Sequence, residues 1–272
     1  MCSRCMPEAV NGPKGPNGPD DPEGPDGPNG PNGPDGRDAG ARSVPVSVRR
    51  LPGLLLRRRA ANRPDAMPFL GCSFADLDRR ARAVAARLGL VVPPGSRILL
   101  AYPQGVDLAG AFFGCLYAGM SAVPLVAAGA GGPDRPGAIA QAVERCRPAA
   151  VLTGGDAWTS LAVDRSRTQV IEADGSRVGG ERTDRLAASW QPVGVLRSAV
   201  AYERYVAGGA GAAGGLGGGR LEPPLRHCDL GELLGELARA AQLGTPEESV
   251  GWIASVHGLE EAVWRILLPV VS

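Results

Sequence analysis

The sequence predicts an α/β fold: a parallel sheet with flanking helices. Three observations predict it. Short apolar segments typical of buried strands alternate with helix-length segments over residues 46–272. Turn-forming residues separate them, as at Pro93-Pro94-Gly95. Strands that are separated by helix-length segments are joined by crossovers, and crossover connections link parallel strands.

The first well-marked helix begins after Ser73, which we predict as its N-cap. Asp76 then lies in the first turn, near the positive end of the helix dipole. Apolar residues recur at helical spacing at Leu77, Ala81, Val84 and Leu88. Gly89 stands where a C′ glycine would end the helix, so we predict that the helix stops there.

The remaining elements follow in alternation. We predict a strand at 97–102, a helix from about Val106 to Met120, a strand at Ala122–Val126, a helix at about Gly137–Arg145, and strands at Ala149–Leu152 and Gln169–Glu172. Ahead of them lies an arginine-rich segment at 49–63, whose leucines are Leu51, Leu54, Leu55 and Leu56. Two interpretations stay open for these arginines: a patch that binds phosphate or lipid, or the solvated face of an opening helix.

Charge excludes some classes of function. The 272 residues carry 29 basic and 28 acidic side chains, a net charge of +1, so no global field points to nucleic acid or to an anionic membrane. Lys14 is the single lysine. Beyond it, no lysine can bind a γ-phosphate or form a Schiff base.

The six cysteines are scattered, and no apolar signal sequence precedes them. We therefore expect free thiols and a cytoplasmic protein. Cys2 and Cys5 form half of a zinc pattern without a second pair at ligand spacing, so we expect no metal site. The longest uncharged stretch, Leu108–Pro133, is rich in Ala and Gly and is divided by Pro124. We expect a buried helix and strand there, and no membrane span.

Residues 1–45 form a Gly-Pro-rich tail. Glycine recurs every third residue from Gly12 to Gly36, with one interruption at Asp21, mostly in Gly-Pro-Asn and Gly-Pro-Asp triplets. A collagen-like triple helix requires this spacing. The run is short and cannot bury apolar surface, so we favour a disordered tail over a trimerising stalk.

The segments at 51–65, 73–88, 93–125 and 145–153 resemble the N-terminal part of adenylate-forming enzymes. Within that superfamily, the run FFGCLYAG at 112–119, followed by Ala122-Val123-Pro124, is most similar to fatty acyl-AMP ligases. The resemblance implies the α/β fold of these enzymes. It also implies their activity, which converts a fatty acid into an acyl-adenylate with ATP and Mg²⁺ and releases pyrophosphate.

The loop that wraps the ATP phosphates in this family reads roughly Y-T-S-G-S-T-G-x-P-K-G. The aligned residues here are YVAGGAGAAGG at 205–215. The resemblance implies that Gly208, Gly211 and Gly215 are the remnant of this phosphate loop, since glycine lets backbone N–H groups approach phosphate. The family's serines and threonines are missing, and Gly214 stands at the lysine position. A phosphate loop without hydroxyls or a cation should bind ATP weakly.

The same residues also satisfy a dinucleotide-binding pattern, with glycines at 209, 211 and 214. That pattern needs a helix to begin at its end, and the glycine run at 217–219 disfavours one. We therefore interpret the segment as a flexible loop.

Two later segments continue the resemblance. Residues 226–230 are similar to the entry into a helix that we expect to run to about Leu243. The run WIASVHGL at 252–259 is similar to the family's W-L-P-x-Y-H-D-M-G-L, whose histidine lies near the acyl substrate. His257 matches that histidine, whereas Gly258 replaces the following aspartate. His257 is therefore a substrate-side candidate, with an ordinary helix-start histidine as the alternative.

These observations predict a tail at 1–45, an α/β subdomain at 46–206, a Gly-rich loop at 207–224 and a continuation of the subdomain at 225–272. The apolar run Trp264–Ser272 resembles a cut through a core element, so we expect a truncated enzyme without turnover of its own. Two alternatives remain: a non-catalytic module that binds an acyl chain or docks on a carrier protein or synthetase, and an unstable fragment without function.

Overall fold

The computed structural model describes residues 51–125, 137–154, 163–164, 166–207, 219–242 and 260–271. All of them belong to one compact unit, Ser43–Ser272. The predicted tail at 1–45, with Cys2, Cys5 and Lys14, lies outside the described residues.

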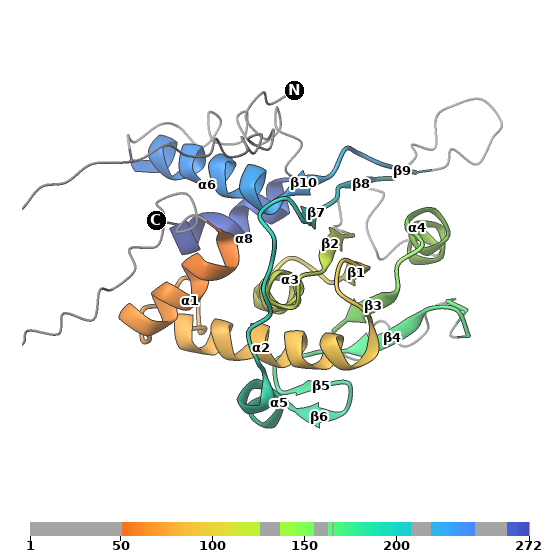
Figure 1. The fold of residues 1–272 in the computed structure, drawn as a ribbon, viewed down its shortest axis with the longest axis horizontal. Coiled ribbons are helices and arrows are strands. Elements are labelled where there is room, and N and C mark those ends of the chain that lie inside the picture. The colour runs from red at the N-terminus through yellow and green to blue at the C-terminus, as the bar shows by residue number, and fades with distance from the viewer. Residues whose placement is uncertain are drawn as a thin grey trace, which may run out of the picture. The chain divides into compact units, whose positions relative to one another are not determined.

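The centre of the fold is a six-stranded sheet in the order β10-β7-β2-β1-β3-β4. Its strands are β1 (Arg97–Ala101), β2 (Ser121–Pro124), β3 (Ala150–Thr153), β4 (Gln169–Glu172), β7 (Val200–Tyr202) and β10 (Leu225–Arg226). Five are parallel to their neighbours, and β10 runs antiparallel to β7 at one edge. The predicted parallel α/β sheet is therefore confirmed (Figure 1). The four predicted strands all form, with bounds within two residues of those expected.

Helices cover both faces of the sheet. They are α1 (Pro52–Asn62), α2 (Phe74–Val91), α3 (Val106–Ala118), α4 (Ala138–Cys146), α5 (Thr183–Ser189), α6 (His227–Gln242) and α8 (Glu261–Val271). Side chains alternate along β1: Ile98 and Leu100 join the larger apolar cluster with α1, α2, α3, α6 and α8. Leu99 and Ala101 join a smaller cluster under α4. This period of two follows from the pleat of a strand that is buried on both faces.

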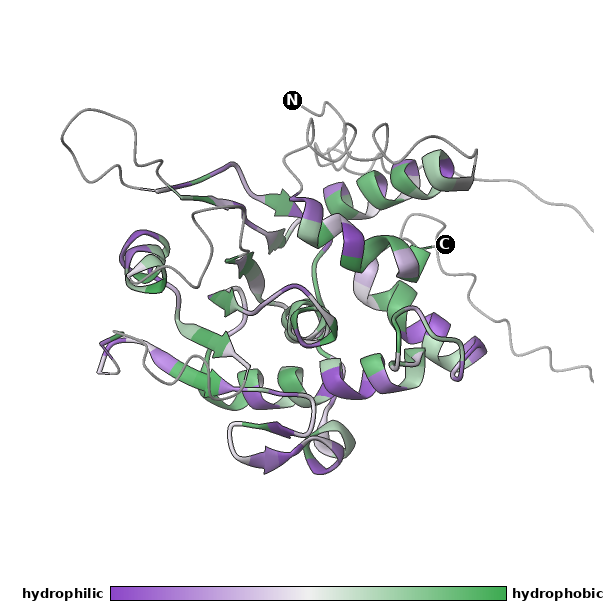
Figure 2. Cartoon of the chain, turned by 180° about the vertical axis from the view of Figure 1, so that it is seen from behind, coloured by the Kyte–Doolittle hydropathy of each residue, from purple (hydrophilic) through white to green (hydrophobic). Residues whose placement is uncertain are grey.

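The helix α3 lies in the core, with eleven of its thirteen residues buried. Figure 2 shows apolar residues along α3 and the central strands, and polar residues along the outer side of α2. The uncharged stretch that begins at Leu108 thus forms a core helix and β2, and its residues 126–133 lie outside the described part. Among the helices of the described residues, none combines the length and the hydropathy that a membrane span requires.

The start of α2 is as predicted, and its end is not. Ser73 Oγ accepts a hydrogen bond from the Asp76 backbone N–H (3.1 Å), and the Asp76 carboxylate accepts one from the Ser73 N–H (3.3 Å). The predicted stop at Gly89 is wrong, because the helix continues to Val91. It ends where Val92 becomes extended ahead of Pro93, since a residue before proline disfavours the helical conformation.

The opening helix α1 places its arginines in specific contacts. Arg57 lies over the Trp190 ring, 5.4 Å from its centroid. Arg59 donates hydrogen bonds to the carbonyls of Val270 (3.2 Å) and Val271 (3.0 Å) at the end of α8. Leu56 is fully buried, whereas Leu54 is exposed. Leu54 therefore does not belong to the buried apolar side that we expect for this helix.

Candidate functional site: the base of the glycine-rich hairpin

A two-stranded hairpin leaves the sheet after β7. Strand β8 (Tyr205–Val206) pairs antiparallel with β9 (Arg220–Leu221), Tyr205 facing Leu221 and Val206 facing Arg220. Residues 208–218 connect the two strands and lie outside the described residues, and with them the predicted loop glycines Gly208, Gly211 and Gly215. The structure thus brings the two strands that flank residues 208–218 side by side.

Tyr205 anchors this hairpin to the small apolar cluster. Its ring is buried beside Ile139, Ala142 and Cys146 of α4. A Cβ at Gly219, the last residue of the glycine-rich run, would collide with the Tyr205 phenol ring. Glycine is therefore required at this position by close approach of the ring.

An ion cluster closes the base of the hairpin. Arg204 lies 3.3 Å from the Glu222 carboxylate and 3.4 Å from the Glu260 carboxylate. The Glu222 N–H also donates a backbone hydrogen bond to the Arg204 carbonyl (2.9 Å). On the other side, Arg220 lies 3.8 Å from Glu222. We call Arg204, Glu222 and Glu260 the hairpin-base cluster.

Glu260 connects this cluster to the second predicted segment. It is the residue just before α8, and it directly follows residues 251–259, which include His257 and lie outside the described residues. The Glu260 N–H donates a hydrogen bond to the buried Tyr202 hydroxyl (3.4 Å) at the end of β7. Arg204 and Glu222, which border the glycine-rich segment, therefore meet Glu260, which borders the segment that contains His257, in one cluster.

The electrostatics of the cluster favour a protonated carboxyl. Burial raises the pKa of Glu260 to about 7, with Glu222 adding to the rise and Arg204 opposing it. Glu260 Oε2 is buried and has no hydrogen-bond partner among the described residues. Because burial disfavours its charged form and Arg204 opposes this only in part, Glu260 can take up and release a proton near neutral pH.

The other histidine of the chain, His227, lies within the described residues and is buried. His227 begins α6, and burial lowers its pKa to about 4. Its Nε2 is buried without a hydrogen-bond partner among the described residues. The imidazole is therefore neutral at physiological pH.

A separate contact ties β7 to the sheet. The buried Glu203 carboxylate accepts hydrogen bonds from Arg97 Nε (2.8 Å) and from the Ser121 hydroxyl (2.8 Å). This contact crosses three adjacent strands, so it holds the strand from which the hairpin departs.

Other chemistry is sparse in the described part. Cys72, Cys115, Cys146 and Cys228 are buried there and form no disulfide with one another, and burial raises the pKa of the Cys146 thiol to about 12. Among the same residues, no group of three or more His, Cys, Asp and Glu side chains is arranged to hold a metal ion. Sequence reasoning missed the hairpin-base cluster, because nothing in the spacing of its three residues predicts that they meet.

The comparisons with known proteins agree with this architecture. Residues 56–199, which are 144 of the 272 residues, match the family model described as AMP-binding enzyme. The chain belongs to the AMP-binding enzyme family. The matched range ends just before β7, so the glycine-rich segment and His257 lie beyond it.

Two curated members of the family are long-chain-fatty-acid–AMP ligases named FadD32. The one from Mycolicibacterium smegmatis is 27% identical over 210 residues, which cover 74% of this chain and 30% of that ligase. The one from Mycobacterium marinum is 26% identical over 197 residues, which cover 68% and 28%. This chain therefore spans less than a third of the length of the relatives that it matches.

A solved structure shares the fold. The crystal structure of the fatty acid AMP ligase from Legionella pneumophila superposes with a TM-score of 0.61 at 21% identity, and the match covers 84% of this chain and 39% of that one. The described sheet and helices thus have the arrangement found in part of an adenylate-forming enzyme.

Proposed function

We propose that this AMP-binding family member is a fatty acid-activating ligase by descent, and that it does not form acyl-adenylate by itself. The observation that carries the first half is the similarity to long-chain-fatty-acid–AMP ligases over 74% of the chain. Such an enzyme joins the carboxylate of a fatty acid to the α-phosphate of ATP and releases pyrophosphate.

The second half rests on the glycine-rich hairpin. The residues that correspond by resemblance to the phosphate loop contain no Ser, Thr or Lys. At the base of the hairpin, Arg204 is committed to two carboxylates, and the largely exposed Arg220 is the cation nearest to the loop in sequence. Phosphoryl chemistry depends on cations and hydroxyls placed around the phosphates.

The hairpin-base cluster does not fit the Mg²⁺ ion that accompanies ATP. Both carboxylates of the hairpin-base cluster are engaged by Arg204, and the pKa of Glu260 lies near neutrality. Mg²⁺ prefers ionised carboxylates and phosphate oxygens in octahedral geometry. The hairpin-base cluster therefore does not suit Mg²⁺ coordination.

The proposal is tested by pyrophosphate release. The full chain is incubated with ATP, Mg²⁺ and fatty acids of several chain lengths, and released pyrophosphate is measured against a reaction without fatty acid. We expect no fatty acid-dependent release at any chain length. Release that depends on a fatty acid would contradict the proposed inactivity and would support the proposed descent.

A restoring variant tests the role of the loop. Gly214→Lys returns a cation to the position that the resemblance assigns to lysine. We expect tighter binding of ATP by about tenfold or more, since a charge-assisted contact contributes roughly 1.5–3 kcal/mol. Gly217→Lys is the matched control, because it adds the same charge three positions later in the same run. Equal gains in both variants would mean that charge alone, and not loop position, governs binding.

The absence of hydroxyls and a cation from the loop also favours a second candidate: a non-catalytic module that binds an acyl chain or docks on a carrier protein. One relative, JamA of Moorena producens, is a medium-chain-fatty-acid–[acyl-carrier-protein] ligase, 29% identical over 147 residues that cover 50% of this chain and 23% of that ligase.

Thermal melts of the full chain separate the two candidates. A ligand at one hundred times its Kd adds about 2.7 kcal/mol to the free energy of unfolding. Stabilisation by a non-hydrolysable acyl-adenylate analogue but not by a fatty acid alone would favour a retained nucleotide pocket. Equal stabilisation by both would favour the acyl-binding module.

A further inference from the structure

A pocket of about 420 Å³ lies between α2, α5 and a second hairpin, which is formed by β5 (Arg177–Val178) and β6 (Glu181–Arg182). Its residues are distant in sequence from the glycine-rich hairpin β8–β9. Seven residues line it: three arginines, one aspartate, two residues with hydroxyls and one glycine. Its volume is within the usual range for small-molecule pockets, about 300–1,000 Å³, but its lining is polar and basic where most such pockets are apolar.

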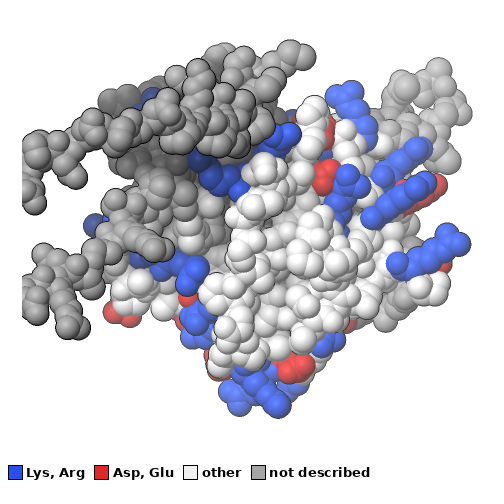
Figure 3. Space-filling model, in the orientation of Figure 1, with Lys and Arg blue, Asp and Glu red and all other residues white. Residues whose placement is uncertain are grey.

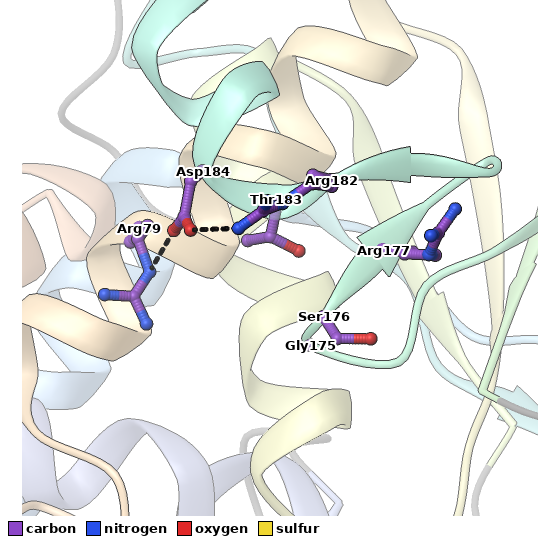
Figure 4. A pocket seen from close by; sticks show the side chains of 7 residues that line it. All are labelled: Arg79, Gly175, Ser176, Arg177, Arg182, Thr183 and Asp184. Carbon is purple, nitrogen blue, oxygen red and sulfur yellow. Dashed lines mark ion pairs between the residues drawn. The ribbon is translucent and has the colours of Figure 1, made fainter.

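Two of the arginines lie at opposite positions on neighbouring strands. Arg177 and Arg182 are register partners across the antiparallel pair β5–β6. Like charges that stand directly opposite on neighbouring strands are unfavourable. In Figure 4 the two guanidinium groups point apart, that of Arg182 toward Asp184 and that of Arg177 to the other side of the pocket. This divergence lowers the repulsion between the two side chains, and an anion in the pocket would lower it further.

The negative charge within the pocket is already compensated. Asp184 lies 3.1 Å from Arg79 and 3.7 Å from Arg182. Arg79 also pairs with Asp76 at 2.8 Å. Arg177 donates to the Gly180 carbonyl (3.0 Å), and the described part of the chain shows no carboxylate paired with it. The lining residues therefore carry an excess of positive charge, and Figure 3 shows basic side chains gathered at this lower edge of the molecule.

Thr183 supplies an independent observation. It lines the pocket, its side chain is buried with the residue only 3% exposed, and its hydroxyl has no hydrogen-bond partner among the described residues. In Figure 4 this hydroxyl points toward the side of the pocket where Ser176 and Arg177 lie. A buried hydroxyl without a partner is unfavourable unless a bound group completes it.

The Ser176 side of the pocket is held rigidly. The Asp174 carboxylate accepts hydrogen bonds from the Ser176 N–H (2.9 Å), the Ser176 hydroxyl (2.8 Å) and the Arg177 N–H (2.9 Å). These bonds fix the turn from which Arg177 departs, and its guanidinium has further N–H donors besides the one bound to the Gly180 carbonyl. Arginine matches the oxygen geometry of phosphate with two parallel N–H donors.

We propose that this pocket binds the phosphate group of a small phosphorylated molecule, held by Arg177, Arg182 and the Thr183 hydroxyl. The site is separate from the proposed phosphate loop, because its residues come from α2, α5 and β5–β6. Failure of the proposed function would leave it unaffected.

Calorimetric titration of the full chain with inorganic phosphate, pyrophosphate and AMP tests the proposal, with chloride at matched ionic strength as the blank. We expect binding of at least one of the three, weakened about tenfold or more by Arg177→Gln and by Arg182→Gln. Preference for AMP over inorganic phosphate would assign the site to a phosphate monoester, and the reverse preference to the free ion. No heat with any of the three probes would overturn the proposal.

Two further variants separate a specific site from general charge and from a folding role. Arg185→Gln removes an exposed arginine of α5 that does not line the pocket, and we expect it to leave binding unchanged. Thr183→Val keeps the shape of the side chain and removes the hydroxyl. We expect it to weaken binding while the free protein unfolds at the same or a higher temperature. Equal weakening by Arg185→Gln, or binding that survives in the Arg177→Gln/Arg182→Gln double variant, would contradict the proposal.

Discussion

Arg204 lies 3.4 Å from Glu260, and this contact joins the base of the glycine-rich hairpin to the start of α8. The two residues belong to segments that are separated in the sequence by all of α6. Glu222 competes for the same guanidinium at 3.3 Å. Because the arginine is shared, Glu260 is a buried carboxyl with incomplete charge compensation, and its titration should be visible in the stability of the protein.

Glu260→Gln should change the pH dependence of stability. Burial raises the pKa of Glu260 to about 7 from its ordinary 4.5, so the folded state binds a proton more tightly than the unfolded state. This contribution is fully present below about pH 4.5 and is lost as the pH rises through about 7. Glutamine keeps the size and does not titrate. We expect the variant to gain on the order of 3 kcal/mol relative to the wild type between pH 4.5 and 8.

Urea unfolding of both proteins at a series of pH values measures this difference. A difference in unfolding free energy that stays constant across the range would show that Glu260 does not titrate in the window.

His227→Gln should have the opposite sign. Burial lowers the pKa of His227 to about 4 from its ordinary 6.5, so only the unfolded state binds a proton between these values. The contribution of His227 is present above about pH 6.5 and is lost as the pH falls toward 4. We expect the wild type to lose on the order of 3 kcal/mol relative to the variant on acidification across this window.

The two contributions oppose each other between about pH 4.5 and 6.5. The wild type should therefore show a shallow pH profile there, and each single variant a steeper one in opposite directions. Parallel profiles for the two single variants would be incompatible with this assignment.

At Gly114, α3 packs closely against Val84 and Ala81 of α2. A Cβ at this position would lie 2.5 Å from Val84 Cγ1 and 3.2 Å from the Ala81 carbonyl oxygen. Gly114→Ala should therefore destabilise the protein by about 1–3 kcal/mol through overpacking. Gly89→Ala is the matched control, since nothing lies within 4 Å of its added Cβ and the residue is inside α2. We expect it to stabilise by about 0.5–1 kcal/mol. Chemical denaturation of both variants measures the contrast, and equal effects would refute it.

Gly89 also shows where reading the sequence reaches its limit. The apolar spacing of Leu77, Ala81, Val84 and Leu88 predicted α2 correctly, and Ser73 fixed its start. Gly89 predicts an end that is too early, and Pro93 is the stronger signal, because it disfavours a helical conformation at the preceding Val92. Local rules that compete within a few residues thus leave an element's existence clear and its boundary uncertain.

The hairpin-base cluster could not be predicted by any local rule. Arg204, Glu222 and Glu260 come together only through the pairing of β8 with β9 and the packing of α8. The β5–β6 pairing, which places Arg177 opposite Arg182, could not be predicted from the sequence either, since each of these strands has only two residues. Periodicity needs several residues to be recognised, so short strands and the contacts that they create emerge only from the structure.

Tyr117→Phe should reveal the contribution of one buried hydrogen bond. The Tyr117 hydroxyl donates to Asp78 Oδ1 at 2.6 Å, and Arg82 lies 2.8 Å from the other oxygen of that carboxylate. Phenylalanine keeps the stacking on Trp190, whose ring centroid lies 5.1 Å away. Loss of the hydroxyl leaves a buried carboxylate with one partner fewer, so we expect a cost of about 1.5–3 kcal/mol.

Tyr102→Phe is the comparison that isolates the role of charge. The buried Tyr102 hydroxyl donates to a neutral acceptor, the Ala173 carbonyl, at 3.1 Å. Its loss should cost about 1 kcal/mol, because hydrogen bonds between neutral groups contribute less than those to a charged group. Both variants are compared with the wild type by urea unfolding at neutral pH. If Tyr117→Phe costs no more than Tyr102→Phe, the charge of the Asp78 carboxylate does not strengthen its hydrogen bond to Tyr117. The Arg80–Asp107 ion pair (2.7 Å) would then remain as a charged contact between α2 and α3.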